Sequence, residues 1–227
     1  MTNKEAIQRV LSLYSRGPGA AAARLSRRHV WNKLVTVRER LIVQQINKNQ
    51  KISQWSYQTV PCVEMIPVPE IECPCVPPVG YHILRSKHKL PAVMTSMDKH
   101  LIQSVTSLDG SLRYDETRWE SKKYRKGGKY TASSVDYFIK GDYLWLTATR
   151  KPEKVTITVL GSDPIKWALF GYCCDSNTTP CVDFLSLEFP IEAGMFDALI
   201  ELTVIELVEG FARRKEDREA NGKDDVQ

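Results

Sequence analysis

The sequence has no long apolar run. No part of its 227 residues approaches the roughly 20 consecutive apolar residues that a membrane-spanning helix needs. The first residues, Met1 to Glu5, are polar and charged, unlike a signal peptide. These absences predict a protein that contacts no membrane and is made and kept in a cytoplasm.

The usual motifs of catalysis are also missing. The sequence contains no glycine-rich phosphate loop, no nucleophile elbow and no HExxH motif. Its four histidines, His29, His82, His88 and His100, are dispersed among basic or polar neighbours. An active site needs a nucleophile with a base, paired carboxylates, a metal cage or a phosphate cradle. We therefore predict a protein that is not an enzyme and has no cofactor.

The sequence has six cysteines, and five of them form two groups. Cys73 and Cys75 enclose one proline, and Cys173 and Cys174 are adjacent, with Cys181 nearby. Zinc ligation, a disulfide formed after release from the cell, and unmodified thiols all remain open. Structural zinc sites typically use cysteines two to four residues apart, and a reducing cytoplasm keeps thiols unmodified. We expect no metal at these residues.

Charge is distributed unevenly along a chain of otherwise ordinary composition. Apolar residues make up 42% and charged residues 26%, which is typical of a globular protein. Residues 24–51 contain eight Lys or Arg and a single acid, Glu39, whereas residues 182–210 contain seven acids and no base. Opposite charge on two segments from the two ends of the chain favours their pairing, within one subunit or between neighbours.

Helical patterns occupy both ends of the chain. Thr2 and Glu5 form a possible capping box for a first short helix, and Ser26 is a good N-cap for a second, long one. The second helix carries one apolar stripe, formed by Val30, Leu34, Val37, Leu41 and Ile46. A third helix begins near Ile191 and has too many apolar residues for one narrow seam. We expect it to be buried on more than one side and to be the partner of the second helix.

The middle of the chain has the pattern of a small β-domain. Asp109-Gly110 and Lys140–Asp142 are hairpin turns between apolar segments, and Val155–Leu160 is a further strand. Prolines interrupt residues 55–68, which predicts an edge strand or extended arm. Residues 163–170 form one more short helix, with Pro164 at its first position.

These elements predict an α+β fold in which the terminal helices form a helical core with an inserted antiparallel β-domain. Residues 1–52 are the N-terminal part of the core, 53–162 the β-rich domain and 163–212 the C-terminal part of the core. Residues 213–227 are a charged tail with almost nothing to bury. We expect this tail to be disordered until a partner binds it.

Residues 122–130, KKYRKGGKY, are the most basic short segment. Its bases are Lys122, Lys123, Arg125, Lys126 and Lys129, with tyrosines between them. Such a segment can contact nucleic acid through phosphates and stacking, although a solvated hairpin tip has the same composition. No helix-turn-helix, zinc finger or RNA-binding strand accompanies it. A nucleic-acid-binding accessory protein that uses this segment and the basic helix is the alternative function.

Four segments resemble the connector, or ring, proteins of crAss-like podoviruses, which infect gut Bacteroidetes. They are SRRHVWNKLVTVRERLIVQQINKNQKISQWSYQTVPCVEM, HILRSKHKLP, IQSVTSLDGS and YFIKGDYLWL. The likeness covers nearly the whole chain in the same order. It implies a structural subunit in a homo-oligomeric ring of twelve copies between portal and tail, with the portal protein and other connector or tail rings as partners and duplex DNA in transient passage. Positions directly beneath the portal and lower in the tail both remain open.

A ring subunit must bind two identical neighbours as well as the rings above and below it. We predict that charged and apolar residues of the terminal helices form these interfaces. They are Arg27, Arg28, Lys33, Arg38, Arg40, Leu199, Ile205, Phe211, Arg213, Arg214 and Lys215. Tight phosphate binding would hinder the passage of a genome, so protein partners are favoured for most of these bases.

Overall fold

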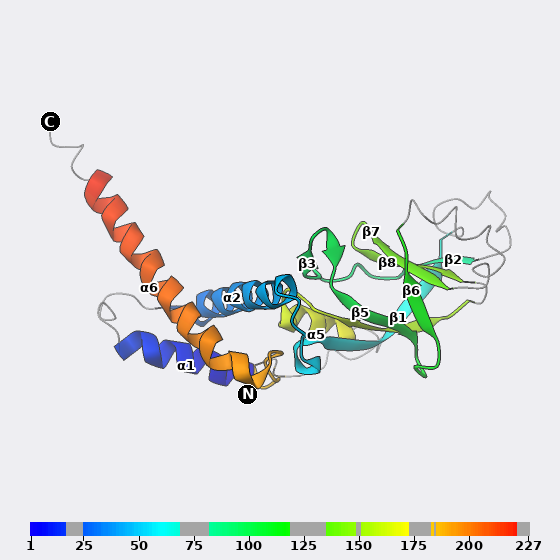
Figure 1. Cartoon of the computed structure of the whole chain (residues 1–227), viewed down its shortest axis with the longest axis horizontal. Coiled ribbons are helices and arrows are strands. Elements are labelled where there is room, and N and C mark those ends of the chain that lie inside the picture. Colours follow the sequence, from blue (N-terminus) through cyan, green and yellow to red (C-terminus); the bar gives the residue numbers. More distant parts are fainter. Residues whose placement is uncertain are drawn as a thin grey trace. The chain divides into compact units, whose positions relative to one another are not determined.

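The chain folds into two compact units, one built from both of its ends and the other from its middle (Figure 1). The computed structural model describes residues 1–16, 25–68, 82–118, 135–148, 151–172, 183 and 185–221. The helical unit comprises Met1–Ser56 and Val182–Gln227, and the barrel unit comprises Tyr57–Cys181. The structure is therefore of mixed helical and strand content, as predicted.

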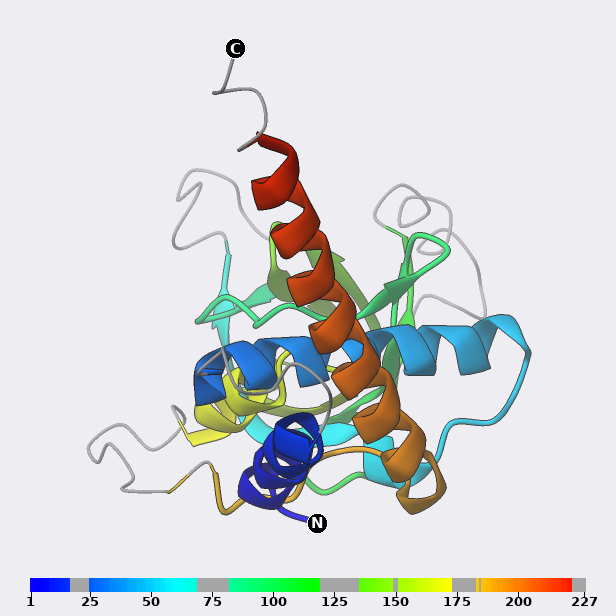
Figure 2. The same ribbon diagram turned by 90° about the vertical axis from the view of Figure 1, so that its left-hand side faces the viewer.

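Three helices form the helical unit, and each packs against the other two. They are α1 (Asn3–Arg16), α2 (Arg27–Asn47) and α6 (Phe196–Asn221), with two short 3-10 helices, η2 (Gln54–Ser56) and η4 (Ala193–Met195). Figure 2 shows α6 crossing α2, with α1 beside them. The pairing of the second helix with the C-terminal helix, predicted from apolar stripes and opposite charge, is confirmed.

Local caps fix where the first two helices begin. The Thr2 hydroxyl accepts a hydrogen bond from the Glu5 backbone N–H at 3.2 Å, and the Glu5 carboxylate accepts one from the Thr2 N–H at 2.9 Å. Ser26 accepts from the backbone N–H of His29 at 3.2 Å. Both caps satisfy N–H groups that have no partner within a helix, and both confirm the prediction.

Aromatic side chains near the start of α6 pack together and join this end of the helix to α2. Phe189 meets Trp31 of α2 edge to face, with ring centroids 5.7 Å apart, and also meets Phe196 at 6.5 Å. The backbone N–H of Asn3 donates to the Leu187 carbonyl at 2.8 Å, so the N-terminus is attached to the same segment. The segment before α6 thus contacts both α1 and α2.

The prediction of a disordered tail is wrong for residues 213–221, because α6 continues to Asn221. The sequence of this stretch, RRKEDREAN, is rich in strong helix formers and places bases and acids four residues apart, as at 213/217 and 215/219. Such pairs favour a helix without any apolar residue to bury. Residues 222–227 lie outside the described part of the chain.

The barrel unit is a closed barrel with the strand order β1-β2-β8-β7-β6-β5-β9. Its strands are β1 (Gln58–Pro67), β2 (His82–Ser86), β5 (Ile102–Ser107), β6 (Arg113–Glu116), β7 (Asp136–Lys140), β8 (Tyr143–Ala148) and β9 (Lys154–Val159), and β3 (Thr95–Ser96) pairs with β4 (Lys99–His100) separately. The expectation of a purely antiparallel sheet is wrong at one place, since β6 and β7 are parallel. Residues 117–135 give this crossover the length that a parallel pair requires.

The prediction of an edge strand or extended arm at residues 55–68 is also wrong. Strand β1 is paired on both sides, with β2 and with β9. Its register with β9 shifts between Val60 and Val63, and Cys62 there has a φ of 62°. Pro61 lies in this bulge, where the missing N–H interrupts no regular ladder.

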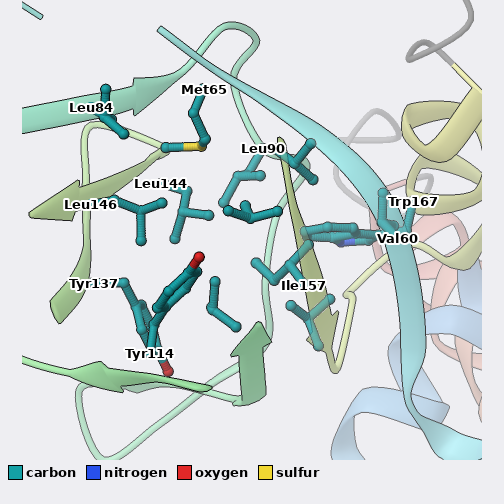
Figure 3. Packing of buried hydrophobic residues seen from close by; sticks show 14 residues of the cluster. Val60, Met65, Leu84, Leu90, Tyr114, Tyr137, Leu144, Leu146, Ile157 and Trp167 are labelled. Carbon is teal, nitrogen blue, oxygen red and sulfur yellow. The ribbon is translucent and has the colours of Figure 1, made fainter. Parts of the chain in front are cut away.

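Alternating residues of the strands fill the barrel (Figure 3). Leu144, Val105 and Ile157 are fully buried there. Two turns predicted from the sequence direct the strands back: Gly110 has a φ of 70°, and Gly141 and Asp142 have φ values of 61° and 65°. Hydrogen bonds from the Ser107 and Ser111 side chains lower the pKa of Asp109 in the first turn to about 2.

Helix α5 (Pro164–Tyr172) packs on β1 and completes the barrel unit. Its Trp167 is fully buried in the barrel core, and the indole N–H donates to the Ala92 carbonyl at 3.0 Å. A Cβ on Gly161 would overlap this indole ring and the side chain of Gln58. The sequence predicted that the barrel ends at residue 162 and that α5 belongs to the helical core. In the structure α5 belongs to the barrel unit, because its apolar face is buried against β1.

We expect Gly161→Ala to destabilise the protein by about 1–3 kcal/mol, because the added methyl group must displace a buried indole. Gly210→Ala is the matched control. Gly210 lies in α6 with nothing within 4 Å of an added Cβ, so the same change should stabilise by up to about 1 kcal/mol. Urea unfolding of both variants measures the two effects. Equal effects would contradict the close approach at Gly161.

Candidate subunit interface

The bases in the middle of α2 are used inside the helical unit. Lys33 Nζ lies 2.7 Å from Glu206 Oε2 on α6, and the Arg40 guanidinium contacts the other oxygen of the same carboxylate. The Glu206 side chain is only 15% exposed. Two of the bases predicted for subunit contacts therefore hold α2 and α6 of one chain together.

The surroundings of Glu206 shift its pKa in two directions. Burial raises the pKa, but the contact with Lys33 and the charges of Lys33 and Arg40 together outweigh burial. The pKa of Glu206 is consequently below its ordinary value of 4.5. The carboxylate is charged at neutral pH and attracts both bases.

Arg38 is fully buried, which excludes it as a residue on the surface of the subunit. Its Nε donates to the Pro190 carbonyl at 2.7 Å, and its Nη2 donates to the Ser56 carbonyl at 3.0 Å. A buried guanidinium needs such acceptors, since an unpaired charge away from water is costly. The prediction of Arg38 as a subunit contact is wrong, because the side chain joins three segments of its own chain.

The other predicted interface residues divide by burial. Leu199, on the inner face of α6, is fully buried and is therefore no surface contact. Ile205 is 50% exposed, and Arg27 and Arg28 are exposed. Phe211 and the bases Arg213, Arg214 and Lys215 follow on α6, with side chains outside the described part of the structure.

An apolar stripe faces outward from α6. Leu202, Ile205 and Val208 are 37%, 50% and 40% exposed, and they recur every three residues along one face of the helix. Glu201 and Glu209 lie one helical turn before and after Ile205 on that same face, and both are exposed. The opposite face is buried and includes Leu199, Ile200, Thr203 and Leu207. We call the exposed trio the α6 stripe.

The α6 stripe corrects one expectation. The number of apolar residues at 191–211 predicted burial on more than one side, yet the described residues bury only one side of α6. The sequence does indicate a second apolar face on this helix, because these apolar residues are too many for one packing seam. It does not say whether the second seam is covered by the same chain or by another.

The barrel unit exposes apolar side chains at two hairpin tips, and the sequence did not single out these side chains as contacts. Met97, 82% exposed, lies between β3 and β4, whereas Leu108 and Leu112, 53% and 54% exposed, flank the turn between β5 and β6. These tips lie at opposite ends of β5, since the first precedes that strand and the second follows it. The residues with φ values above zero at the first tip are Met97 (48°) and Asp98 (60°).

Cationic side chains lie over aromatic rings on β8. The guanidinium of Arg85 on β2 is 4.5 Å from the ring centroid of Tyr143 and 5.8 Å from that of Trp145, and Lys89 is 5.9 Å from Tyr143. Trp145 stacks in turn on Phe138 of β7, at 5.9 Å and 14°. The residues of this cluster lie in two of the segments that carry the family resemblance, HILRSKHKLP and YFIKGDYLWL, but only the pairing of β2 with β8 brings them together.

Within the described ranges, no group of three or more His, Cys, Asp or Glu is placed to hold a metal ion. The same part of the chain contains no helix long and apolar enough to cross a membrane. Of the six cysteines, only Cys62 is described, so both predicted cysteine groups lie outside the described residues. The basic segment Lys122–Lys129 does so as well.

Hydrogen bonds and ion pairs hold the helical unit together, and an apolar stripe faces outward from α6, an arrangement typical of structural subunits that bind other proteins. The chain belongs to the family of phage tail ring protein 2, whose model matches residues 5–226. It is 31% identical over 206 residues to ring protein 2 of Bacteroides phage crAss001, with 87% of each chain covered. The resemblance to ring proteins of crAss-like phages is thereby confirmed.

The low pKa of Glu206 makes stability depend on pH. A carboxylate whose pKa is lowered by folding stabilises fully above its ordinary pKa of 4.5, and this contribution disappears as the pH falls through the folded-state pKa. We expect Glu206→Gln to destabilise by about 1 kcal/mol at pH 7 and by much less at pH 3.

Urea unfolding at both pH values, followed by helical circular dichroism, measures this difference. Glu201→Gln is the control, because Glu201 is an exposed carboxylate of the same helix. It should change stability by less than about 0.5 kcal/mol at either pH. Equal losses for Glu206→Gln at pH 7 and pH 3 would show that the ion pairs contribute nothing.

Proposed function

We propose that this chain is a ring-forming subunit of the head-to-tail connector in a tailed-phage virion, between the portal and the tail. The α6 stripe is the observation that carries the proposal. Large apolar residues in a row on an exposed helix face mark a protein contact, and membership in a tail ring family requires contacts between subunits. The subunit contributes in this way to the conduit through which duplex DNA passes.

The two units would have separate tasks in such a ring. The helical unit, made from both ends of the chain, acts as the core that contacts neighbouring copies. The barrel unit, Tyr57–Cys181, acts as an insertion into this core. The hairpin tips at Met97 and at Leu108 and Leu112 support contacts with other rings, because exposed apolar tips at two ends of one strand can reach unlike partners.

The portal contact is assigned to the end of α6 and to exposed bases at the start of α2. Arg213, Arg214 and Lys215 lie on a helix that extends the fold beyond the last buried residue described on it, Leu207. Arg27 and Arg28 are exposed at the first turn of α2. Bases so placed can donate to acidic groups of a portal rim. A ring of twelve copies would match the portal-associated adaptors that the sequence resembles.

A nucleic-acid-binding accessory protein is the second candidate. The cluster of Arg85, Lys89, Tyr143 and Trp145 supports it, because bases over aromatic rings also occur where single strands stack. The basic helix supports it less, since Lys33 and Arg40 pair with Glu206 and Arg38 is buried. Duplex binding by the isolated chain that falls steeply with salt would favour this candidate over the ring.

Ile205→Asp should leave the subunit folded and weaken ring formation by roughly tenfold or more, because it places a charge at the centre of the α6 stripe. The assay is light scattering and electron microscopy of the purified chain, with its copy number per purified phage particle as the second readout. Leu13→Asp is the matched control, since Leu13 is 41% exposed but lies on α1, outside the α6 stripe. A chain that is absent from phage particles would refute the connector function.

Removing residues 213–227 should leave a folded subunit that fails to join portal-containing particles, because the assigned contact bases are lost. Removing only residues 222–227 is the control and should permit normal incorporation. Thermal unfolding tests the fold, and quantitative mass spectrometry of purified particles tests incorporation. Full incorporation of the longer deletion would show that this end of α6 is dispensable.

A further inference from the structure

A ring of identical copies requires two different surfaces on each copy. A surface that pairs with itself about a two-fold axis ends at a dimer, whereas a contact between unlike surfaces can repeat until the ring closes. The α6 stripe supplies one surface. Its partner on the next copy has to be a second exposed surface that accepts apolar side chains.

Trp55 has the properties of such a partner. It is 74% exposed, more than any other large apolar residue described in the helical unit; outside the α6 stripe, Met1 and Leu13 follow at 47% and 41%. Tryptophan is also the residue type most enriched among the side chains that dominate protein interfaces.

The backbone beneath Trp55 is held in place. Ser56, the next residue, is buried, and its carbonyl accepts a hydrogen bond from the buried Arg38. An anchor presented on a fixed backbone loses less conformational entropy when it binds. Trp55 therefore projects from a rigid part of the helical unit.

Charge on the two surfaces is complementary. Lys48 and Lys51 are exposed between α2 and η2, and residues 41–56 contain no acid. On α6, residues 198–210 contain three acids and no base. Glu206 is neutralised within the chain, which leaves Glu201 and Glu209 beside the α6 stripe. Opposite charge of this kind sets orientation and rejects wrong partners.

We propose that Trp55 of one copy packs on the α6 stripe of the next copy, between Glu201 and Glu209, with Lys48 and Lys51 facing these carboxylates. This contact rests on the ring function proposed above and names the surfaces that form it. It is a head-to-tail contact, in which each copy uses Trp55 toward one neighbour and the α6 stripe toward the other.

Mixing two defective variants tests the contact directly. Trp55→Ala disables one surface and Ile205→Asp the other, so each variant alone should remain a folded monomer by light scattering and circular dichroism. An equimolar mixture still contains one intact pair of surfaces, and it should form a complex of two copies and stop there. Leu13→Ala, at an exposed apolar residue outside both surfaces, should form rings like the unaltered chain.

Zero-length carbodiimide crosslinking of purified phage particles is the second test, because it needs no reassembly. It should join Lys48 or Lys51 to Glu201 or Glu209, as identified by mass spectrometry of the peptides. Crosslinks of these lysines only to other sites would overturn the proposed contact.

The outcomes separate this contact from the ring function itself. Ring formation by Trp55→Ala, with loss of rings in Ile205→Asp, would overturn the role of Trp55 and leave the ring intact. Complexes larger than two copies in the mixture would likewise exclude a two-surface contact. Absence of the chain from phage particles would refute the ring function, and the contact with it.

Discussion

The buried guanidinium of Arg38 is the interaction on which the helical unit depends. It bonds to the carbonyl of Ser56, where the chain leaves this unit, and to that of Pro190, shortly after it returns. The segments that flank the barrel unit in the sequence are thus fixed to the middle of α2. Truncating such a side chain typically costs about 1–3 kcal/mol for each carbonyl that stays buried without a donor. A long insertion between the two points is compatible with this arrangement, since its ends are held at fixed positions.

Once these segments are joined, part of the charge of the unit is used within the chain. Glu206 neutralises two of the bases of α2, so the opposite charge of the two chain ends serves folding before it serves assembly. What remains on the outside of α6 is apolar, with acids at its borders. Under the proposed ring function, the helical unit folds through its own contacts and still exposes a surface for a neighbour. Obligate interfaces, in contrast, are commonly as apolar as a domain core cut in half.

Closure of the barrel affects the edges of its strands. Closure removes the free edges at which strands of neighbouring copies would pair without specificity, which matters for a protein held at high local concentration in a ring. A strand with an internal proline can still be central in this barrel. Proline has no N–H to donate, and Pro61 lies in the bulge with Cys62, where the regular pairing of β1 with β9 is interrupted. Exposed side chains at the hairpin tips, such as Met97, remain available for specific contact.

Features set by neighbours in the sequence were predictable from the sequence alone. The caps at Thr2 and Ser26 and the turn at Asp109-Gly110 depend on side chains and backbone within a few residues, so their pattern is sufficient. The burial of Arg38 was not predictable, because its acceptors are 18 and 152 residues away and are backbone carbonyls that any residue type provides. The same holds for α6: its apolar pattern shows two seams, but only the packing of α1 and α2 decides that Leu199 is buried and that Ile205 faces outward. Spacing in the sequence determines which residues share a face, and tertiary packing determines which face remains for a partner.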